Sequence, residues 1–98
     1  MEIADEGLLD TLGDRFVRSL LKAVDRRPKS AQELSRELSI PLTSCYRRLR
    51  LLEESSLVEV AESRLQPNGR RVNYYRSRIR SLSITLDRDL IVRLSVDF

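Results

Sequence analysis

A run of cations and hydroxyls between residues 42 and 54 carries the side-chain types that recognise a polyanion. Guanidinium groups pair with phosphates and with the O6 and N7 atoms of guanine, and hydroxyls supply further directional hydrogen bonds. At 3.6 residues per turn, these side chains spread over one broad arc of a helix. They are Thr43, Ser44, Tyr46, Arg47, Arg48 and Arg50. We interpret residues 42–54 as a recognition helix.

The other side of the same helix is apolar. Leu42, Cys45, Leu49 and Leu52 recur at i, i+3, i+7 and i+10, which is the spacing of one helical stripe. We therefore expect this stripe to pack on a core. The alternative is an ordinary solvated basic helix, because the polar arc also contains Leu51, which a nucleic-acid face does not require. The flanking elements decide between the two.

Two helices are expected before residue 42. Asp14 has the residue type of an N-cap, and helical spacing follows it in Phe16, Val17, Leu20, Leu21 and Val24. Residues 26–29 should end this helix, because the residue before a proline is pushed out of the helical region. Ser30 and Glu33 then have the spacing of a capping box, ahead of an apolar stripe formed by Ala31, Leu34 and Leu38. With a short turn at 39–41, this is the helix-turn-helix pattern, whose second helix enters a DNA major groove.

A basic β-hairpin is expected after residue 56. The apolar period changes from helical to two at Val58 and Val60, and residues 72–76 form the returning strand. The segment 67–69 supplies turn chemistry, because asparagine and glycine tolerate positive φ. The polar residues that flank this turn are Arg64, Asn68, Arg70 and Arg71. They could reach phosphates or the adjacent minor groove, and their alternative is an ordinary charged hairpin.

The two ends of the chain are also patterned. Residues 1–13 mix apolar and acidic side chains, which indicates an N-terminal arm or short helix. Residues 77–98 alternate again around a turn at 87–89, and the apolar positions are Leu82, Ile84, Leu86, Val92, Leu94, Val96 and Phe98. This C-terminal hairpin should bury its apolar face against the domain or a partner chain, so it is the leading candidate for a dimer contact.

The charge of the chain is regional. Residues 42–80 hold nine arginines against four glutamates, whereas residues 1–41 and 81–98 are each one charge negative, within a net charge of +3. The regional surplus fits an electrostatic footprint for a polyanion. The 98 residues suit one domain, 1–98, and lack the spacing of a catalytic site, so no enzyme activity is expected.

The single cysteine rules out an intrachain disulfide, and with it a disulfide-stapled secreted fold. No apolar run approaches a membrane span, and the acidic start is unlike a signal peptide. We therefore expect a soluble cytoplasmic protein. Cys45 could be a redox switch, but its place on the apolar stripe favours a small buried hydrophobe.

The order helix, capped helix, turn, helix and basic hairpin resembles the winged helix-turn-helix regulators, especially the ArsR-like branch. The similarity covers roughly residues 12–76 and is most specific in the segments Leu12–Leu21, Ser30–Leu38 and Thr43–Val58. It implies an α+β fold with three main helices and a basic wing, to which this chain adds the C-terminal hairpin. Metal-sensing members use clustered Cys, His and carboxylate ligands; this chain has no His and one Cys, so no metal and no cofactor is expected.

The resemblance places Thr43, Ser44, Arg47 and Arg48 on groove-facing positions, with Arg47 as the leading candidate for a base or phosphate contact. It implies a sequence-specific regulator that binds double-stranded DNA as a homodimer. For Arg48 and Arg50 the alternative is a surface ion pair with Glu53 or Glu54.

Two other kinds of function stay open. A winged-helix module that docks on a protein of a transcription or nucleic-acid-processing assembly would depend on Tyr46 and Leu51 rather than on the arginines. RNA binding is weaker, because the aromatic residues that stack on single strands are few.

Overall fold

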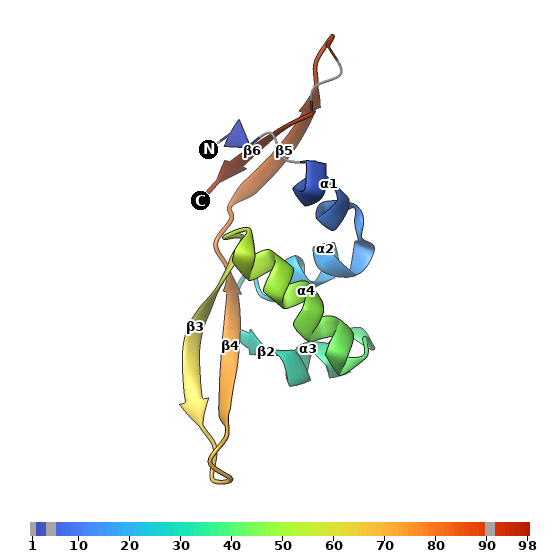
Figure 1. Cartoon of the computed structure of the whole chain (residues 1–98). Coiled ribbons are helices and arrows are strands. Elements are labelled where there is room, and N and C mark those ends of the chain that lie inside the picture. The colour runs from blue at the N-terminus through green and yellow to red at the C-terminus, as the bar shows by residue number, and fades with distance from the viewer. Residues whose placement is uncertain (1, 4–5, 90–91) are drawn as a thin grey trace.

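The computed structural model describes residues 2–3, 6–89 and 92–98, which form four α-helices and six β-strands (Figure 1). The helices are α1 (Glu6–Gly13), α2 (Arg15–Ala23), α3 (Ala31–Leu38) and α4 (Leu42–Glu54). The strands are β1 (Glu2–Ile3), β2 (Lys29–Ser30), β3 (Val58–Leu65), β4 (Arg71–Ser77), β5 (Ser81–Leu86) and β6 (Val92–Asp97). The expected α+β fold, with a helix-turn-helix, a basic hairpin and an added C-terminal hairpin, is confirmed. The N-terminal segment contains both a short strand and a helix.

The first helix of the expected pattern, α2, begins as predicted and ends early. Asp14 is its N-cap, and the carboxylate accepts the Phe16 amide at 2.8 Å. The helix ends at Ala23, ahead of the segment 26–29 that was expected to end it. The reason lies in β4: the Val24 carbonyl accepts the Ser77 amide at 3.0 Å, which directs the chain away from the helical ladder.

The helix-turn-helix consists of α3, a tight turn and α4. Ser30 and Glu33 form both bonds of the expected capping box at the start of α3. Ser39 ends α3 in the left-handed region at φ 54°, and the chain reverses into α4 over the buried Ile40. The Ser35 hydroxyl donates to the Ile40 carbonyl and closes the turn. These local bonds set the angle at which α4 leaves the turn.

Two three-stranded antiparallel sheets flank the helices, with strand orders β2-β4-β3 and β1-β6-β5. The β3–β4 hairpin contains an irregularity between Val60 and Glu62, where the register shifts. The β3–β4 and β5–β6 hairpins point in opposite directions along the long axis of the molecule, which measures 56 Å (Figure 1). Both ends of the chain lie in the second sheet, because β1 pairs with β6.

One hydrophobic cluster joins the helices to both sheets. Cys45, Leu49 and Leu52 of α4 are fully buried in it, as their stripe predicted. The prediction was wrong for Leu42, which is 39% exposed, because the first turn of α4 extends past the edge of the core. The C-terminal hairpin contributes Leu94, which is buried in the same cluster.

An ion pair between Asp14 and Arg48 ties α2 to α4. Arg48 Nε lies 2.8 Å from Asp14 Oδ2, and its guanidinium stands over the Phe16 ring, 5.1 Å from the ring centre. Partial burial acts to raise the pKa of Asp14, but the hydrogen bonds from Arg48 and from the Phe16 amide outweigh it and hold the pKa below its ordinary value of 3.8. The ionised form of Asp14 is therefore favoured more strongly in the folded chain than in the unfolded chain.

We expect Asp14→Asn to lower the free energy of unfolding by about 1 to 2 kcal/mol at neutral pH, because asparagine still caps α2 but leaves Arg48 without its carboxylate. A lowered folded pKa stabilises the fold above the unfolded-state value, and this stabilisation is lost as the pH falls through the folded pKa. The difference between wild type and D14N should therefore shrink as the pH falls below the ordinary carboxyl range. Denaturant titrations across this range measure it.

Glu62→Gln is the matched control, because it removes an exposed ion pair with Arg64 and should change stability much less. If wild type and D14N lose stability in parallel as the pH falls, the Asp14 charge does not hold the two helices together.

Candidate nucleic-acid interface

The outermost line of α4 is formed by Thr43, Arg47 and Arg50. These residues recur at i, i+4 and i+7 on the side of the helix opposite the buried Cys45 and Leu49, and all three are exposed. Among the described residues, neither arginine makes an ion pair, so both guanidiniums are available to an outside partner. Ser44 lies on one flank of this line and is half-buried.

A groove of about 490 Å³ separates α4 from the sheet and is lined by Tyr46, Arg47, Arg50, Glu53 and Tyr75. Tyr75 of β4 forms part of its wall and is largely buried, and this burial raises the pKa of its phenol. The Tyr46 hydroxyl accepts a hydrogen bond from Gln32 Nε2 at 3.1 Å, which links the starts of α3 and α4. The groove thus presents two guanidiniums beside two phenols.

Arg48 turns away from this face. Its side chain is only 12% exposed, with the Asp14 carboxylate and the Phe16 ring as its partners. Within the described residues, Arg48 and Arg50 make no ion pair with Glu53 or Glu54, so the alternative that assigned them these partners was wrong. The reason is the helical angle: Arg48 lies beside the buried stripe and reaches α2. A DNA contact by Arg48 stays a prediction, and it would compete with this ion pair.

The turn of the β3–β4 hairpin is built by Asn68 and Gly69. The Asn68 side chain accepts the Arg70 amide at 2.9 Å, and the Gly69 amide donates to the Gln66 carbonyl at 2.9 Å. Gly69 has φ 83°, a conformation that a residue with a side chain rarely adopts. Asn68 therefore shapes the tip through its own side chain.

The arginines of this hairpin differ in what they contact. Arg64 binds Glu62 through two hydrogen bonds, at 2.7 and 3.0 Å, and its guanidinium stands 4.5 Å from the centre of the Tyr74 ring. Arg70 and Arg71 are exposed beside the turn, and neither forms an ion pair within the described part of the chain. The tip thus carries two positive charges without an ion-pair partner among the described residues. The charge of Arg64 is neutralised by Glu62, two residues earlier on the same strand.

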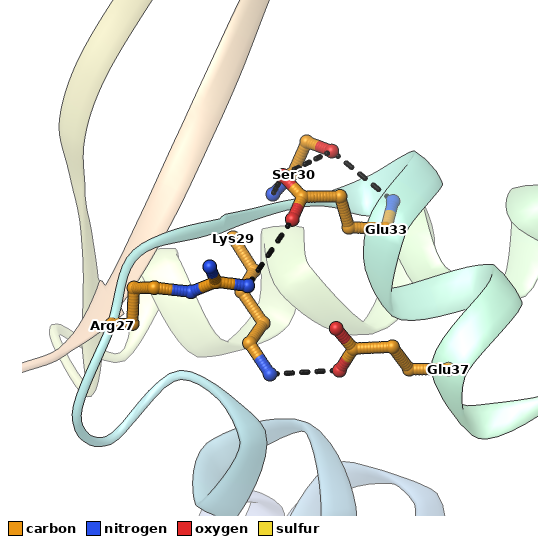
Figure 2. A network of polar contacts seen from close by, with 5 residues as sticks. All are labelled: Arg27, Lys29, Ser30, Glu33 and Glu37. Carbon is orange, nitrogen blue, oxygen red and sulfur yellow. Dashed lines mark hydrogen bonds and ion pairs between the residues drawn. The ribbon is translucent and has the colours of Figure 1, made fainter.

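Two cations before α3 are paired with carboxylates. Lys29 Nζ lies 2.7 Å from Glu37 Oε2, and Arg27 Nη2 lies 3.7 Å from Glu33 Oε2. Both pairs lie beside the capping box of Ser30 (Figure 2). The Ser30 hydroxyl is buried and accepts the Glu33 amide, as the capping-box spacing predicted. Two of the three cations in this segment are therefore paired, and Arg26 makes no ion pair among the described residues.

Cys45 is fully buried, and burial raises the pKa of its thiol. The neutral thiol is the form that packs in a core, in agreement with its place on the apolar stripe. No group of three or more His, Cys, Asp or Glu that could hold a metal occurs in the ranges 2–3, 6–89 and 92–98. Across those ranges, no helix is long and apolar enough to cross a membrane.

The predicted site residues thus fall into three groups, with Ser44 on the flank of the first. The structure brings Thr43, Tyr46, Arg47 and Arg50 together on α4, and it places Asn68, Arg70 and Arg71 at the hairpin tip on the far end of the same sheet that borders the groove. Arg48 and Arg64 are engaged within the chain.

Sequence reasoning missed Asp14 as the partner of Arg48 and Tyr75 as a wall of the groove. The alternation along residues 72–76 carried a signal for Tyr75, because it separates the two adjacent tyrosines onto opposite faces of the strand.

A comparison with protein-family models matches residues 12–61 to a helix-turn-helix domain. No curated protein sequence matches the chain. The matched region begins at the end of α1, contains α2, the complete helix-turn-helix of α3 and α4, and stops within β3. The match thus covers half of the chain and includes the helix that carries Arg47 and Arg50, and the protein belongs to the helix-turn-helix domain family.

Proposed function

We propose that the protein is a sequence-specific transcriptional regulator that binds double-stranded DNA as a winged helix-turn-helix protein of the ArsR-like, non-metal-sensing branch. The observation that carries the proposal is the outward line of Thr43, Arg47 and Arg50 on α4, whose two guanidiniums pair with no carboxylate among the described residues. The second helix of a helix-turn-helix lies in the major groove, with the residues of its N-terminal part on the base edges. On α4 that part begins with Thr43 and Ser44.

The start of α4 supports contact with the DNA backbone as well. Its N-cap is Pro41, and no side chain caps the first turn, so its amides are open to a phosphate. By contrast, the first turns of α2 and α3 are capped by Asp14 and Ser30. Arg47 follows one turn into α4 and has the reach and geometry to pair with guanine O6 and N7.

The β3–β4 hairpin is the wing in this proposal. Arg70 and Arg71 bind phosphates or enter the adjacent minor groove, and Asn68 orients the tip. Arg64 acts indirectly: it stacks on Tyr74 and pairs with Glu62, and so stiffens the strand that leads to the tip. Sequence-independent affinity then comes from the wing, whereas α4 supplies the discrimination between sequences.

The active form is a homodimer in the cytoplasm, without a cofactor. Two copies would place their recognition helices in half-sites separated by one helical turn, about 34 Å, or by a multiple of it. The partly exposed C-terminal hairpin supports self-association, because exposed apolar residues on a sheet favour a partner.

A protein-docking module is the second candidate, favoured by one observation. Leu42, Tyr46 and Leu51 are all exposed on α4, and protein interfaces concentrate binding energy in such aromatic and apolar anchors. If this function is correct, Leu51→Ala should weaken partner binding more than Arg47→Ala does. If α4 binds DNA, the order should be reversed on duplex DNA.

We expect Arg47→Ala to reduce affinity for a selected duplex by roughly 10- to 100-fold, with a much smaller effect on random duplex, because it removes a base contact. The selected sequence is obtained by enrichment from a random library with the wild-type protein, and affinity is measured by fluorescence anisotropy. Arg88→Ala is the matched control: this exposed arginine lies in the connection between β5 and β6, at the end of the opposite hairpin. Equal losses in R47A and R88A would remove Arg47 from the recognition surface.

We expect Arg70→Ala/Arg71→Ala to weaken binding to all duplex sequences and to flatten the dependence of log K on log salt. Each lost phosphate contact changes the slope by about 0.9, so the double variant should lose roughly 1.8. Titrations at several salt concentrations on random duplex measure this slope. An unchanged slope in the double variant would contradict the role given to the wing.

A further inference from the structure

The β5 strand is an unprotected sheet edge. Sheet edges expose unpaired N–H and C=O groups, and proteins usually blunt them with short strands, charges, prolines or bulges. Among the described strands, the other three edges follow this rule: β1 and β2 have two residues each, and β3 carries three charged residues and a register shift. The sequence of β5, Ser81–Leu86, is SLSITL, with six residues, no charge, no proline and no glycine.

The apolar face that includes β5 is covered at one end only. The register pairs Leu82 with Val96 and Ile84 with Leu94, so these side chains share one face of the hairpin. Leu94 and Val96 are buried in the core, whereas Ile84 is 47% exposed and Leu86 63% exposed. The uncovered apolar surface thus lies on the same strand as the unprotected edge.

The lack of charge along β5 indicates what kind of strand it accepts. About a third of the chain is charged, and β3, β4 and β6 each carry charged residues. A charged partner strand would find no counter-charge on β5, whereas a second β5 matches it. The alternation also matches itself: an antiparallel pairing with Ile84 opposite Ile84 places Leu82 opposite Leu86 and Ser83 opposite Thr85.

We propose that two copies of the chain pair through β5, antiparallel about a two-fold axis at Ile84, and form one continuous sheet with the order β1-β6-β5-β5-β6-β1. This inference rests on the proposed homodimer and assigns its interface. Ile84 lies opposite Ile84 of the partner copy, and every other pair in the contact occurs twice, once on each side of the axis. A two-fold interface requires this arrangement. The backbone bonds satisfy the free edge, and Ile84 and Leu86 bury against the partner copy.

The register gives the test. Ser83 and Thr85 are exposed and lie on the opposite face from Ile84. Thr85 stands opposite Arg93 of its own chain, so a lysine at position 85 lowers the stability of the hairpin, and thermal melts measure this cost. In S83K/T85K, each lysine at position 83 meets a lysine at position 85 of the other copy, and we expect a monomer. In S83K/T85E, the same positions pair lysine with glutamate, and we expect the dimer to return. Analytical ultracentrifugation of the full chain distinguishes the two states.

Ser95→Lys is the control. Ser95 lies opposite Ser83 on the central strand β6, so this variant adds a charge to the same face without touching the edge, and it should stay dimeric. Thermal melts followed by circular dichroism show that each variant is folded. A monomeric wild type, a dimeric S83K/T85K or a monomeric S83K/T85E would overturn the proposal. The last result also tests the register, because pairing centred on Ser83 would bring two lysines together.

Duplex binding separates this inference from the proposed DNA function. Folded, monomeric S83K/T85K should bind a single half-site like the wild type and lose about 100-fold or more on a duplex with two half-sites, because the second contact is no longer linked to the first. Equal binding of the two-half-site duplex by monomer and dimer would overturn the role of this interface in recognition. If the variants sediment as expected but neither they nor the wild type bind duplex DNA, the β5 pairing is supported and the DNA function is refuted.

Discussion

The carboxylate of Asp14 ties α2 to α4, the helix that carries the outward-facing arginines. One of its oxygens caps α2, and the other pairs with Arg48 in the middle of α4. A single charged group thus caps one helix and anchors the other. The buried stripe of Cys45, Leu49 and Leu52 sets the rotation of α4 about its own axis. Arg48 therefore lies beside the stripe and reaches Asp14, whereas Arg47 and Arg50 are directed outward.

The arginines of this chain therefore do two different jobs. Arg48, Arg64, Arg76 and Arg78 have carboxylate or aromatic partners and position structure. Arg47, Arg50, Arg70 and Arg71 make no ion pair within the described residues and leave their charge to an outside partner. The division depends on placement in three dimensions: Arg48 has its carboxylate across a helix contact, and Arg64 and Arg76 have theirs on the same face of the β3–β4 hairpin. A count of charges along the sequence cannot make this distinction, because the regional surplus does not tell which arginines are paired.

The elements of the fold were largely predictable from local rules, and the partners of single side chains were not. Capping at Asp14 and Ser30, the apolar stripe of α4 and the turn at Gly69 each depend on a few neighbouring residues, so their patterns are readable in the chain. Leu42 was wrongly predicted to pack on the core, because its exposure depends on where the core ends. The pairing of Arg48 with Asp14, 34 positions apart in the sequence, depends on the angle between two helices, which no local pattern specifies.

The base of the β3–β4 hairpin is fastened to the helices by main-chain bonds. β2 pairs with β4 directly before α3, and the Ser77 amide binds the Val24 carbonyl at the end of α2. Rigid-body motion of the hairpin against α4 would break these bonds, so only its outer part can bend. Part of the conformational entropy that a two-point contact with a long ligand would cost is thus already lost when the chain folds, because the distance between α4 and the base of the hairpin is fixed in advance.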